Sequence, residues 1–534
     1  MFRIEILVIF TVFLILHGKH TEQASLPTDL YYTAGVVEFK QAQLLSKLEE
    51  NLKNYINIIA SDTATSTDIM VFPEGTLNSN NELTYVPDPA KELVSPCELP
   101  KPSIYHSFLI ELSCAAKKYQ KYLVINLSEK GDCPTVLEDT RPCASDGLNK
   151  FNTNVVFDRN GTVISRYRKV HMWNEGKNTT LLPEYGMFDT DFGVRFGHFI
   201  CFDILFYTPT QELVEKYGIT DFIFPTMWFS QLPFLTAVQV HAAWSFGNNV
   251  NLLAAGASFP LIGSTGSGIY AGRQGVLVAK MNTGLGERAL YVATVPKKQT
   301  IPKRFRREVA PKNIANTSTA PRITQSDIYL KPDNIEEYAS EVLDLNQGTS
   351  FTRELCYNNT FCCNFELKWK HLTPVVNSTY YTYRLGVFDG LRREVAPESN
   401  FLKNCAIFSC VGEGIEDCAK IFSSKVGEIE PQIAFERIVI EATFPTSNQL
   451  LIMPNSLKED LMPVPVGNFE WHEKIDNETQ LVRFVLNTTT DNLLTFSIYA
   501  NYFDEQKYGK NSTTSPTSSL MLLLNSWFIF KKIF

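Results

Sequence analysis

The fold and chemistry of this chain are best inferred from one short segment, Gly197-His198-Phe199-Ile200-Cys201-Phe202-Asp203. Its aromatic and β-branched residues predict a strand that runs up to the cysteine. In an α/β fold, strand ends are where reactive side chains reach a site. Cys201 is therefore a candidate nucleophile, and the backbone N–H of Phe202 is a candidate donor to an oxyanion.

Two other apolar runs also end at a polar residue that suits catalysis. Val71-Phe72-Pro73-Glu74-Gly75 presents Glu74, and Arg166-Tyr167-Arg168-Lys169-Val170-His171 presents Lys169. Cleavage of an amide by a thiol needs a nucleophile, a base that later protonates the leaving amine, and a positive charge near the oxyanion. Cys201, Glu74 and Lys169 match these roles, and Lys169 is also expected to lower the pKa of the thiol.

The pattern around these segments predicts an α/β domain. From Tyr31 to about Val295, short β-branched or aromatic runs alternate with longer runs of helical periodicity. Such alternation is typical of sheets covered by helices. The predicted strands include residues 34–39, 68–72, 154–157, 195–200 and 220–224, and the predicted helices are 41–60 and 236–246.

The rest of the chain has a different pattern. A basic segment punctuated by proline, residues 297–322, lacks apolar periodicity and predicts a linker, although its Arg304-Phe305-Arg306-Arg307 run also resembles a processing site. From about Tyr329 to Phe503 the segments are short and alternating, which predicts β-structure. We therefore expect a catalytic domain at 30–298, a basic linker at 299–325 and a smaller β-rich domain at 326–508.

Both ends of the chain carry sequence patterns of targeting signals. Residues 1–24 have the short apolar run of a signal peptide, and residues 509–534 resemble a GPI-attachment signal. The protein is therefore expected to be secreted or held on the extracellular face of the plasma membrane. Nine Asn-x-Ser/Thr sequons fit that location. They begin at Asn126, Asn160, Asn178, Asn316, Asn358, Asn377, Asn477, Asn487 and Asn511.

The cysteine count also separates Cys201 from the rest. The chain has 11 cysteines, so at least one is expected to stay outside intrachain disulfides in an oxidising compartment. Without Cys201, four lie before it and six lie after residue 350, which predicts disulfides within each domain but leaves their connectivity open. A zinc site at Cys356 to Cys363 is disfavoured, because paired C-x-x-C spacing and nearby histidines are missing.

Composition and motifs exclude several other classes of function. The net charge of −8 and the pI near 5.7 give no long-range attraction for nucleic acid. Gly263-Ser264-Thr265-Gly266 lacks the spacing of a serine-hydrolase elbow, and neither a Walker motif nor a dinucleotide fingerprint is present. We therefore expect a small-molecule amide as partner, no cofactor or metal, and membrane contact only through the GPI anchor.

Taken together, these motifs resemble the carbon–nitrogen hydrolase, or nitrilase, superfamily, and within it the vanin and biotinidase branch. The resemblance extends over most of residues 30 to 505. Gly386-Val387-Phe388-Asp389-Gly390-Leu391 lies outside the hydrolase fold and so points to the two-domain branch. The other segments that carry the resemblance are Cys201-Phe202-Asp203-Ile204-Leu205-Phe206, Phe224-Pro225-Thr226-Met227-Trp228, His241-Ala242-Ala243-Trp244 and Gly266-Ser267-Gly268-Ile269-Tyr270.

The resemblance implies a fold and a reaction. The first domain is expected to be a four-layer αββα sandwich, with the smaller β-rich, disulfide-bonded domain beside it. Glu74, Lys169 and Cys201 would form the catalytic triad, and Glu175 is the candidate for a second glutamate. The implied reaction is hydrolysis of a linear secondary amide through a cysteine thioester, with pantetheine giving pantothenate and cysteamine.

Several alternatives stay open at this level. The same triad would serve biotin-amide hydrolysis, and a catalytically silent ectodomain that binds a partner is a further alternative. Trp228 and His241 are candidates for the wall of the acyl pocket. His241 could instead be a hydrogen-bonded structural histidine, and the sequence does not predict the oligomeric state.

Overall fold

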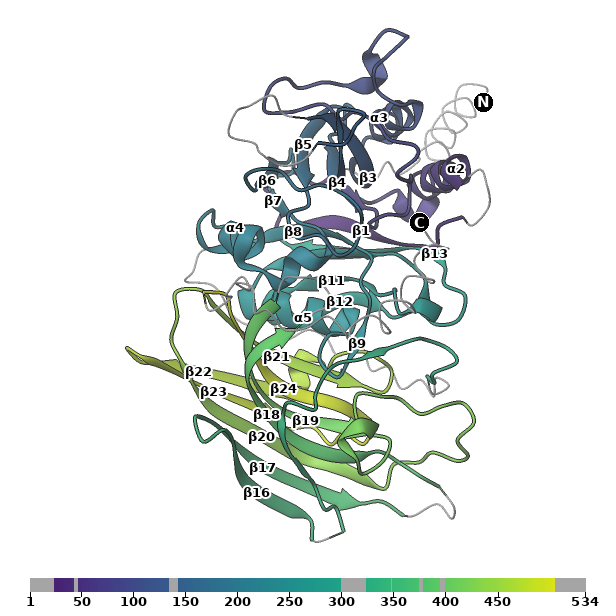
Figure 1. The fold of residues 1–534 in the computed structure, drawn as a ribbon. Coiled ribbons are helices and arrows are strands. Elements are labelled where there is room, and N and C mark those ends of the chain that lie inside the picture. Colours follow the sequence, from purple (N-terminus) through teal and green to yellow (C-terminus); the bar gives the residue numbers. More distant parts are fainter. Residues whose placement is uncertain are drawn as a thin grey trace, which may run out of the picture.

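The first domain of the computed structural model contains two six-stranded sheets (Figure 1). The structure describes residues 24–42, 47–133, 143–298, 323–346, 348–373, 378–393 and 399–504. One sheet has the order β13 (Arg288–Pro296), β1 (Tyr31–Phe39), β2 (Ile69–Val71), β3 (Tyr122–Asp132), β4 (Leu148–Phe157), β5 (Val163–Arg168). The other has the order β12 (Val276–Lys280), β11 (Ser267–Ala271), β10 (Asn251–Gly256), β8 (Asp221–Thr226), β7 (Arg195–His198), β6 (Gly186–Asp189).

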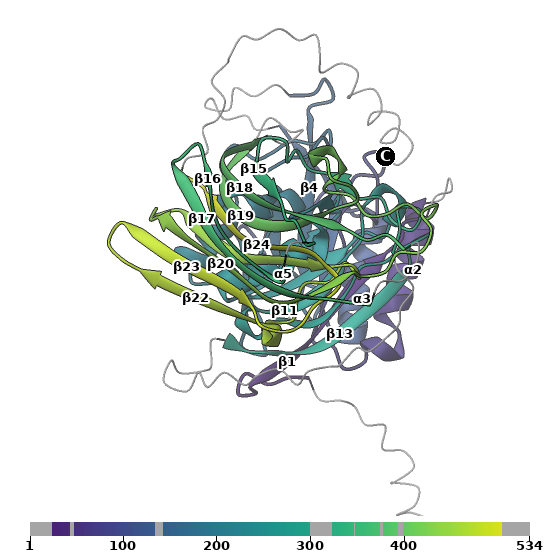
Figure 2. The same cartoon turned by 90° about the horizontal axis from the view of Figure 1, so that it is seen from below.

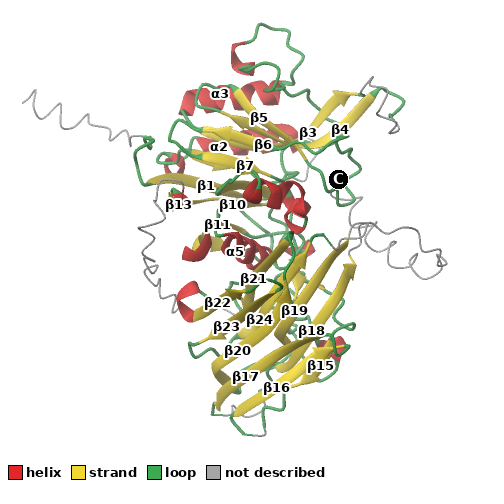
Figure 3. Ribbon diagram, turned by 90° about the vertical axis from the view of Figure 1, so that its left-hand side faces the viewer, coloured by secondary structure: helices red, strands yellow, loops and turns green. Residues whose placement is uncertain are grey.

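Helices cover the outer faces of the two sheets, which confirms the αββα sandwich (Figure 3). Helices α2 (Lys47–Ile59) and α3 (Ser107–Tyr119) pack their buried residues on the first sheet. Helices α4 (Glu212–Glu215) and α5 (Ala237–Asn248) lie on the side of the second sheet. Between the sheets, small and β-branched residues such as Ala34, Val36, Ile223 and Leu253 have no exposed surface. Burial of this apolar area is the main force that holds the layers together.

The second domain is a sandwich of two antiparallel five-stranded sheets, seen from below in Figure 2. One sheet has the order β15 (Ala339–Val342), β18 (Thr382–Arg393), β19 (Ser399–Cys410), β24 (Leu493–Tyr502), β21 (Leu450–Lys458). The other has the order β16 (Ser350–Tyr357), β17 (Phe361–His371), β20 (Ile433–Pro445), β23 (Thr479–Leu486), β22 (Phe469–Ile475). Alternation of buried and partly exposed residues along β17 fits a strand with one face in the core.

The prediction that disulfides form within each domain is confirmed. Ten cysteines pair in five bridges, and Cys201 is the free one. The Cys363–Cys405 bridge joins β17 to β19 and so connects the two sheets of the second domain. The other bridges are Cys97–Cys114, Cys133–Cys143, Cys356–Cys362 and Cys410–Cys418.

Helix α5 is shared between the two domains. One of its faces packs on the second sheet of the hydrolase domain, and its other face contacts β21. A Cβ atom at position 247 would lie 3.0–3.1 Å from atoms of Leu451, Ile452 and Met453, which is tighter than ordinary packing, so glycine favours this close approach of β21. Short strand β14 (Lys331–Pro332) also pairs with β9 (Gln231–Leu232) of the first domain. The domains therefore share one continuous apolar core.

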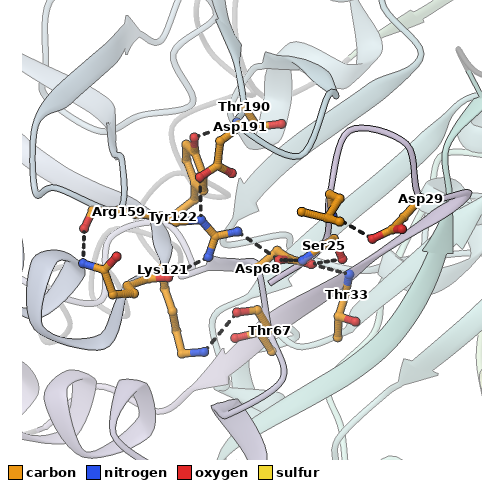
Figure 4. A network of polar contacts seen from close by, with 12 residues as sticks. Ser25, Asp29, Thr33, Thr67, Asp68, Lys121, Tyr122, Arg159, Thr190 and Asp191 are labelled. Carbon is orange, nitrogen blue, oxygen red and sulfur yellow. Dashed lines mark hydrogen bonds and ion pairs between the residues drawn. The ribbon is translucent and has the colours of Figure 1, made fainter. Parts of the chain in front are cut away.

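A network of charged side chains joins the two sheets at the end of the sandwich where β2 begins (Figure 4). Asp68, directly before β2, accepts hydrogen bonds from the Thr33 N–H at 2.9 Å and from Arg159 Nη2 at 2.9 Å. Arg159, after β4, also donates to Asp191 at 2.8 Å, in the hairpin between β6 and β7. Ser25 donates to Asp68 through its hydroxyl at 2.7 Å. This network stabilises the sandwich at one end of β2, and Glu74 follows the opposite end of the strand.

Most predicted elements of the first domain lie where the pattern placed them. The strand predicted at 195–200 ends earlier, at His198, because the chain turns sharply before Cys201. The predicted helix at 41–60 is described from Lys47 onward, and helix α3 was not predicted. The predicted linker at 299–325 lies almost entirely outside the described residues, as do the signal peptide and the GPI signal. Within the described ranges, no helix is long and apolar enough to span a membrane.

The buried amide of Asn455 provides a test of how the domains stabilise each other. It donates to the Phe234 carbonyl at 2.8 Å and accepts from Gln239 at 2.6 Å, both across the domain boundary. Asn455→Leu would remove the Asn455 donor from the Phe234 carbonyl and the acceptor of one Gln239 hydrogen, while the bond of Gln239 Nε2 to the Pro233 carbonyl at 2.9 Å would remain. The cost is about 1–3 kcal/mol for each buried group that loses its hydrogen bond. We expect a lower midpoint of urea unfolding, followed by circular dichroism. The exposed Asn334→Leu serves as control, and equal midpoints for the two variants would contradict the prediction.

Candidate active site

Cys201 lies at a sharp turn between a strand and a short helix. Strand β7 ends at His198, and a 3₁₀ helix begins at Cys201 and ends at Leu205. The cysteine has a positive φ of 49°, a conformation that is strained for a residue with a side chain. Its side chain is 8% exposed. The turn therefore holds the thiol in one fixed position at the end of the second sheet.

Asp203 connects this turn to the end of β5 in the first sheet. Its Oδ2 accepts hydrogen bonds from the Ile200 N–H at 3.0 Å and from the Tyr167 hydroxyl at 2.7 Å. Its Oδ1 accepts from the His171 N–H at 2.9 Å. Asp203 has no exposed surface, so each of these bonds is made in a site of low dielectric constant. The carboxylate thus fixes the segment before Cys201 against the segment that carries Lys169.

The structure brings Glu74, Lys169 and Glu175 together in one ion cluster. Lys169 Nζ lies 2.8 Å from Glu74 Oε1 and makes a short contact with Glu175 Oε1. The Lys169 side chain is 1% exposed, and those of Glu74 and Glu175 are 7% and 12% exposed. A buried ammonium is stable only when it is paired and hydrogen-bonded. Glu175, which sequence left uncertain, is therefore a full member of the cluster.

The thiol of Cys201 belongs to the same cluster. Its charge state is coupled to those of Glu74 and Lys169. Burial alone raises the pKa of Glu74, but Lys169 and the other donors outweigh burial, so the pKa lies below its usual value. The glutamate is therefore ionised at neutral pH and can accept the thiol proton. This geometry is that of a nucleophile beside its general base.

The pKa of the thiol is shifted by opposing effects. Burial, and then the Glu74 carboxylate, raise the pKa of Cys201 far above its usual range. The charge of Lys169 lowers the pKa of the thiol, as expected, but burial and Glu74 outweigh it. A protonated thiol needs a base to become a nucleophile, and Glu74 is the neighbouring carboxylate.

Two groups in the site were missed by sequence reasoning. Asn152 Nδ2 lies 2.7 Å from Glu74 Oε1 and 2.5 Å from Glu175 Oε2. The backbone N–H of Met227 donates to Glu74 Oε2 at 2.8 Å. A backbone N–H leaves no trace in the sequence. Asn152 lies in β4 but two residues before the strand predicted at 154–157, and the sequence pattern gave no sign that it is buried.

The two predicted pocket residues have different outcomes. Trp228 is 5% exposed and donates from Nε1 to the Leu235 carbonyl at 2.9 Å, so its place in the acyl pocket stays a prediction. His241 has no exposed surface and is packed against Phe224 and Tyr270, so it does not line an open pocket. Neither of its ring nitrogens has a hydrogen-bond partner in the described structure, which also contradicts the hydrogen-bonded alternative. Burial lowers its pKa to about 3, so the ring is neutral.

A cavity of about 700 Å³ lies between the domains, on the opposite face of α5 from His241. Gln239 and Phe246 of α5 line it together with Val466 of the second domain. Cys201, Glu74 and Lys169 do not contribute to its wall. This cavity is therefore separate from the catalytic cluster.

The sequons also divide by burial. Asn126 is 1% exposed, and its Nδ2 donates to Asn152 at 2.7 Å and to Asn154 at 3.0 Å. A glycan attached to that nitrogen has no room in the folded protein, so the prediction for Asn126 is wrong. Asn316, Asn377 and Asn511 lie outside the described residues. The sequons with exposed asparagines are Asn160, Asn178, Asn358, Asn477 and Asn487.

Comparison with known proteins agrees with this geometry. A family model described as "Carbon-nitrogen hydrolase" matches residues 33–216, and one described as "Vanin C-terminal domain" matches residues 328–506. "Vanin-like protein 1" of Drosophila melanogaster is 50% identical over 500 residues, which cover 91% of this chain and 88% of that protein. The chain belongs to the vanin and biotinidase branch of the carbon–nitrogen hydrolases. The predicted family is thereby confirmed.

More distant relatives are found in the same branch and superfamily. Biotinidase of Homo sapiens is 28% identical over 480 residues, covering 82% of this chain and 87% of that protein. The crystal structure of Nit3 of Saccharomyces cerevisiae, a member of branch 10 of the nitrilase superfamily, is 18% identical and covers 54% of this chain and 100% of that chain, with a TM-score of 0.38. As a carbon–nitrogen hydrolase, this vanin-branch protein is an enzyme that acts on non-peptide amides.

Replacing Glu74 should have opposite effects on the ionisation of the Cys201 thiol and on amide hydrolysis. Because the Glu74 charge raises the pKa of Cys201, Glu74→Gln should move the midpoint of thiol alkylation by iodoacetamide to lower pH. The same variant should lose at least about 100-fold in amide hydrolysis, since no base accepts the thiol proton. Cys201 is the one thiol outside the disulfides, so mass spectrometry of alkylated protein reports on it alone. An alkylation midpoint unchanged from wild type would show that Glu74 does not contact the sulfur in solution.

Proposed function

We propose that this protein is a secreted or cell-surface amidohydrolase that cleaves a linear secondary amide through a thioester on Cys201, with pantetheine as the first candidate substrate. The observation that carries the proposal is the buried cluster in which the Cys201 thiol, an ionised Glu74 and Lys169 meet. The products would be pantothenate and cysteamine. The disulfides in both domains support folding in an oxidising compartment.

In the first half of the reaction, Cys201 forms a thioester. Glu74 removes the thiol proton while the sulfur attacks the amide carbonyl carbon. The oxyanion that forms would be stabilised by the Lys169 ammonium and by the backbone N–H of Phe202. When the carbon–nitrogen bond breaks, Glu74 delivers its proton to the leaving amine. The amine departs neutral, and the acyl group stays on Cys201.

In the second half, water releases the acid. Glu74, again ionised, accepts a proton from the water that attacks the thioester carbonyl. The tetrahedral intermediate collapses with loss of the Cys201 sulfur, which regains the proton from Glu74. The acid and the resting thiol are the products of this half. One base therefore serves both halves without a cofactor in the proposed scheme.

The choice of pantetheine over a biotinyl amide rests on similarity. Vanin-like protein 1 is 50% identical to this chain, whereas human biotinidase is 28% identical. The triad suits either amide, because it contacts the scissile bond and not the rest of the acyl group. The discriminating residues therefore have to lie along the acyl pocket, where Trp228 is the candidate.

The test is a substrate panel with the purified secreted protein. We expect release of cysteamine from pantetheine, and little release of lysine from biocytin. The reverse preference would replace pantetheine by a biotinyl amide, and inactivity on both would sink both assignments in favour of a silent ectodomain.

Cys201→Ala is the matched control for this panel. We expect it to abolish turnover while secretion and the circular dichroism spectrum stay as in wild type, since loss of one buried sulfur leaves the ion cluster intact. Persistent turnover in this variant would refute the thioester mechanism.

A further inference from the structure

The catalytic carboxylates are held by a neutral amide as well as by a lysine. Asn152, in β4, is 2% exposed, and its Nδ2 contacts both Glu74 Oε1 at 2.7 Å and Glu175 Oε2 at 2.5 Å. An amide nitrogen carries two hydrogens, so each carboxylate receives one. Lys169 bridges the same two carboxylates from its own position. The four side chains therefore form a closed ring of charge-assisted hydrogen bonds.

A second asparagine fixes the direction of this amide. The backbone N–H of Gly75 donates to Asn126 Oδ1 at 2.9 Å, and a backbone N–H can act only as a donor. Asn126 Nδ2 consequently points away from Gly75 and donates to Asn152 Oδ1 at 2.7 Å. Asn152 is left with its two N–H groups facing the carboxylates. The chain of hydrogen bonds thus runs from the Gly75 N–H through Asn126 and Asn152 to the Glu74 carboxylate.

We propose that Asn152, oriented by Asn126, is a positioning residue that holds the carboxylates of Glu74 and Glu175 in place beside Cys201. The proposal rests on the amide-hydrolase function above and assigns the amide no contact with substrate. Glu74 Oε1 receives Lys169 and Asn152, and Oε2 receives the Met227 N–H. Protein donors therefore hold both oxygens, and the carboxylate cannot rotate away from the thiol without losing one of them.

The same contacts bear on the pH at which the enzyme works. Lys169 pairs with both carboxylates, and Lys177, whose own pKa is lowered by burial, also interacts electrostatically with both. Burial by itself favours the neutral form of Glu74. Hydrogen bonds to the charged form oppose this, and those from Asn152 reach both glutamates. Without them the pKa of Glu74 should rise. Since catalysis needs ionised Glu74, activity should then be lost at a higher pH as the pH falls.

The test compares Asn152→Leu with Asn154→Leu, a matched control. Asn154 is also in β4, has no exposed surface and accepts from Asn126 at 3.0 Å, but it does not touch a catalytic carboxylate. The probe is p-nitrophenyl acetate, whose acylation of Cys201 releases p-nitrophenol. Rates are measured from pH 3 to 8, with Cys201→Ala as blank and circular dichroism as the check on folding.

We expect the acylation rate of Asn152→Leu at pH 7 to fall about tenfold or more. We also expect the acid limb of its pH–rate profile, where the rate falls as the pH is lowered, to lie higher by about half a pH unit or more. Asn154→Leu should keep the wild-type limb and stay within about twofold in rate, as expected when no carboxylate contact is lost. If Asn152→Leu does not fold, Asn152→Asp takes its place. It keeps the side-chain shape but adds a third carboxyl group, so the acid limb of its pH–rate profile should lie at a still higher pH.

The opposite outcome is equally clear. An acid limb at the wild-type pH in a folded Asn152 variant would show that the asparagine only fills space, whatever the loss in rate. The probe also separates this question from the substrate. If wild type is acylated by p-nitrophenyl acetate but hydrolyses neither pantetheine nor biocytin, the proposed substrates fail while the role of Asn152 is still decided. Absence of any acylation dependent on Cys201 would overturn both.

Discussion

The burial of one positive charge organises the catalytic end of this molecule. Lys169 is almost without exposed surface, and a lone ammonium in that environment would destabilise the fold by several kcal/mol. Glu74 follows β2 and Glu175 follows β5, so pairing with both joins two segments that are far apart in sequence. Asp203 then connects the cysteine turn of the second sheet to this group. The arrangement that permits the buried charge is the same one that places a base beside a thiol.

Sequence reasoning succeeded where a residue interrupts a strong local pattern. Cys201, Glu74 and Lys169 each end an apolar run, and the structure places them in one cluster. The failures have physical causes of a different kind. The direction of the thiol pKa shift is set first by burial and then by the Glu74 carboxylate, and both depend on the packed structure and have no local signature in the sequence. Asn126 matched a glycosylation sequon, yet in the folded protein its side-chain amide is buried and donates hydrogen bonds to Asn152 and Asn154.

The second domain contributes to the hydrolase fold through helix α5. The helix has one face on the second sheet and the other against β21, so its apolar surface is buried only when both domains are present. The buried contacts of Asn455 with Gln239 and Phe234 cross this boundary, and so do aromatic contacts of Phe234 with Tyr338 and Tyr499. An interface this apolar indicates that the domains form one cooperative unit and not two modules joined by a flexible connection.

The lone sulfhydryl group of Cys201 has a consequence for how the protein reaches its native state. Five disulfides must form while one cysteine stays reduced, and thiol–disulfide exchange proceeds through the thiolate. In the folded protein, a buried sulfur with a raised pKa presents almost no thiolate to the disulfides or to small oxidants. In the proposed mechanism, the need for Glu74 as a base therefore also protects the sulfur from oxidation, because little thiolate is present before the attack on the amide.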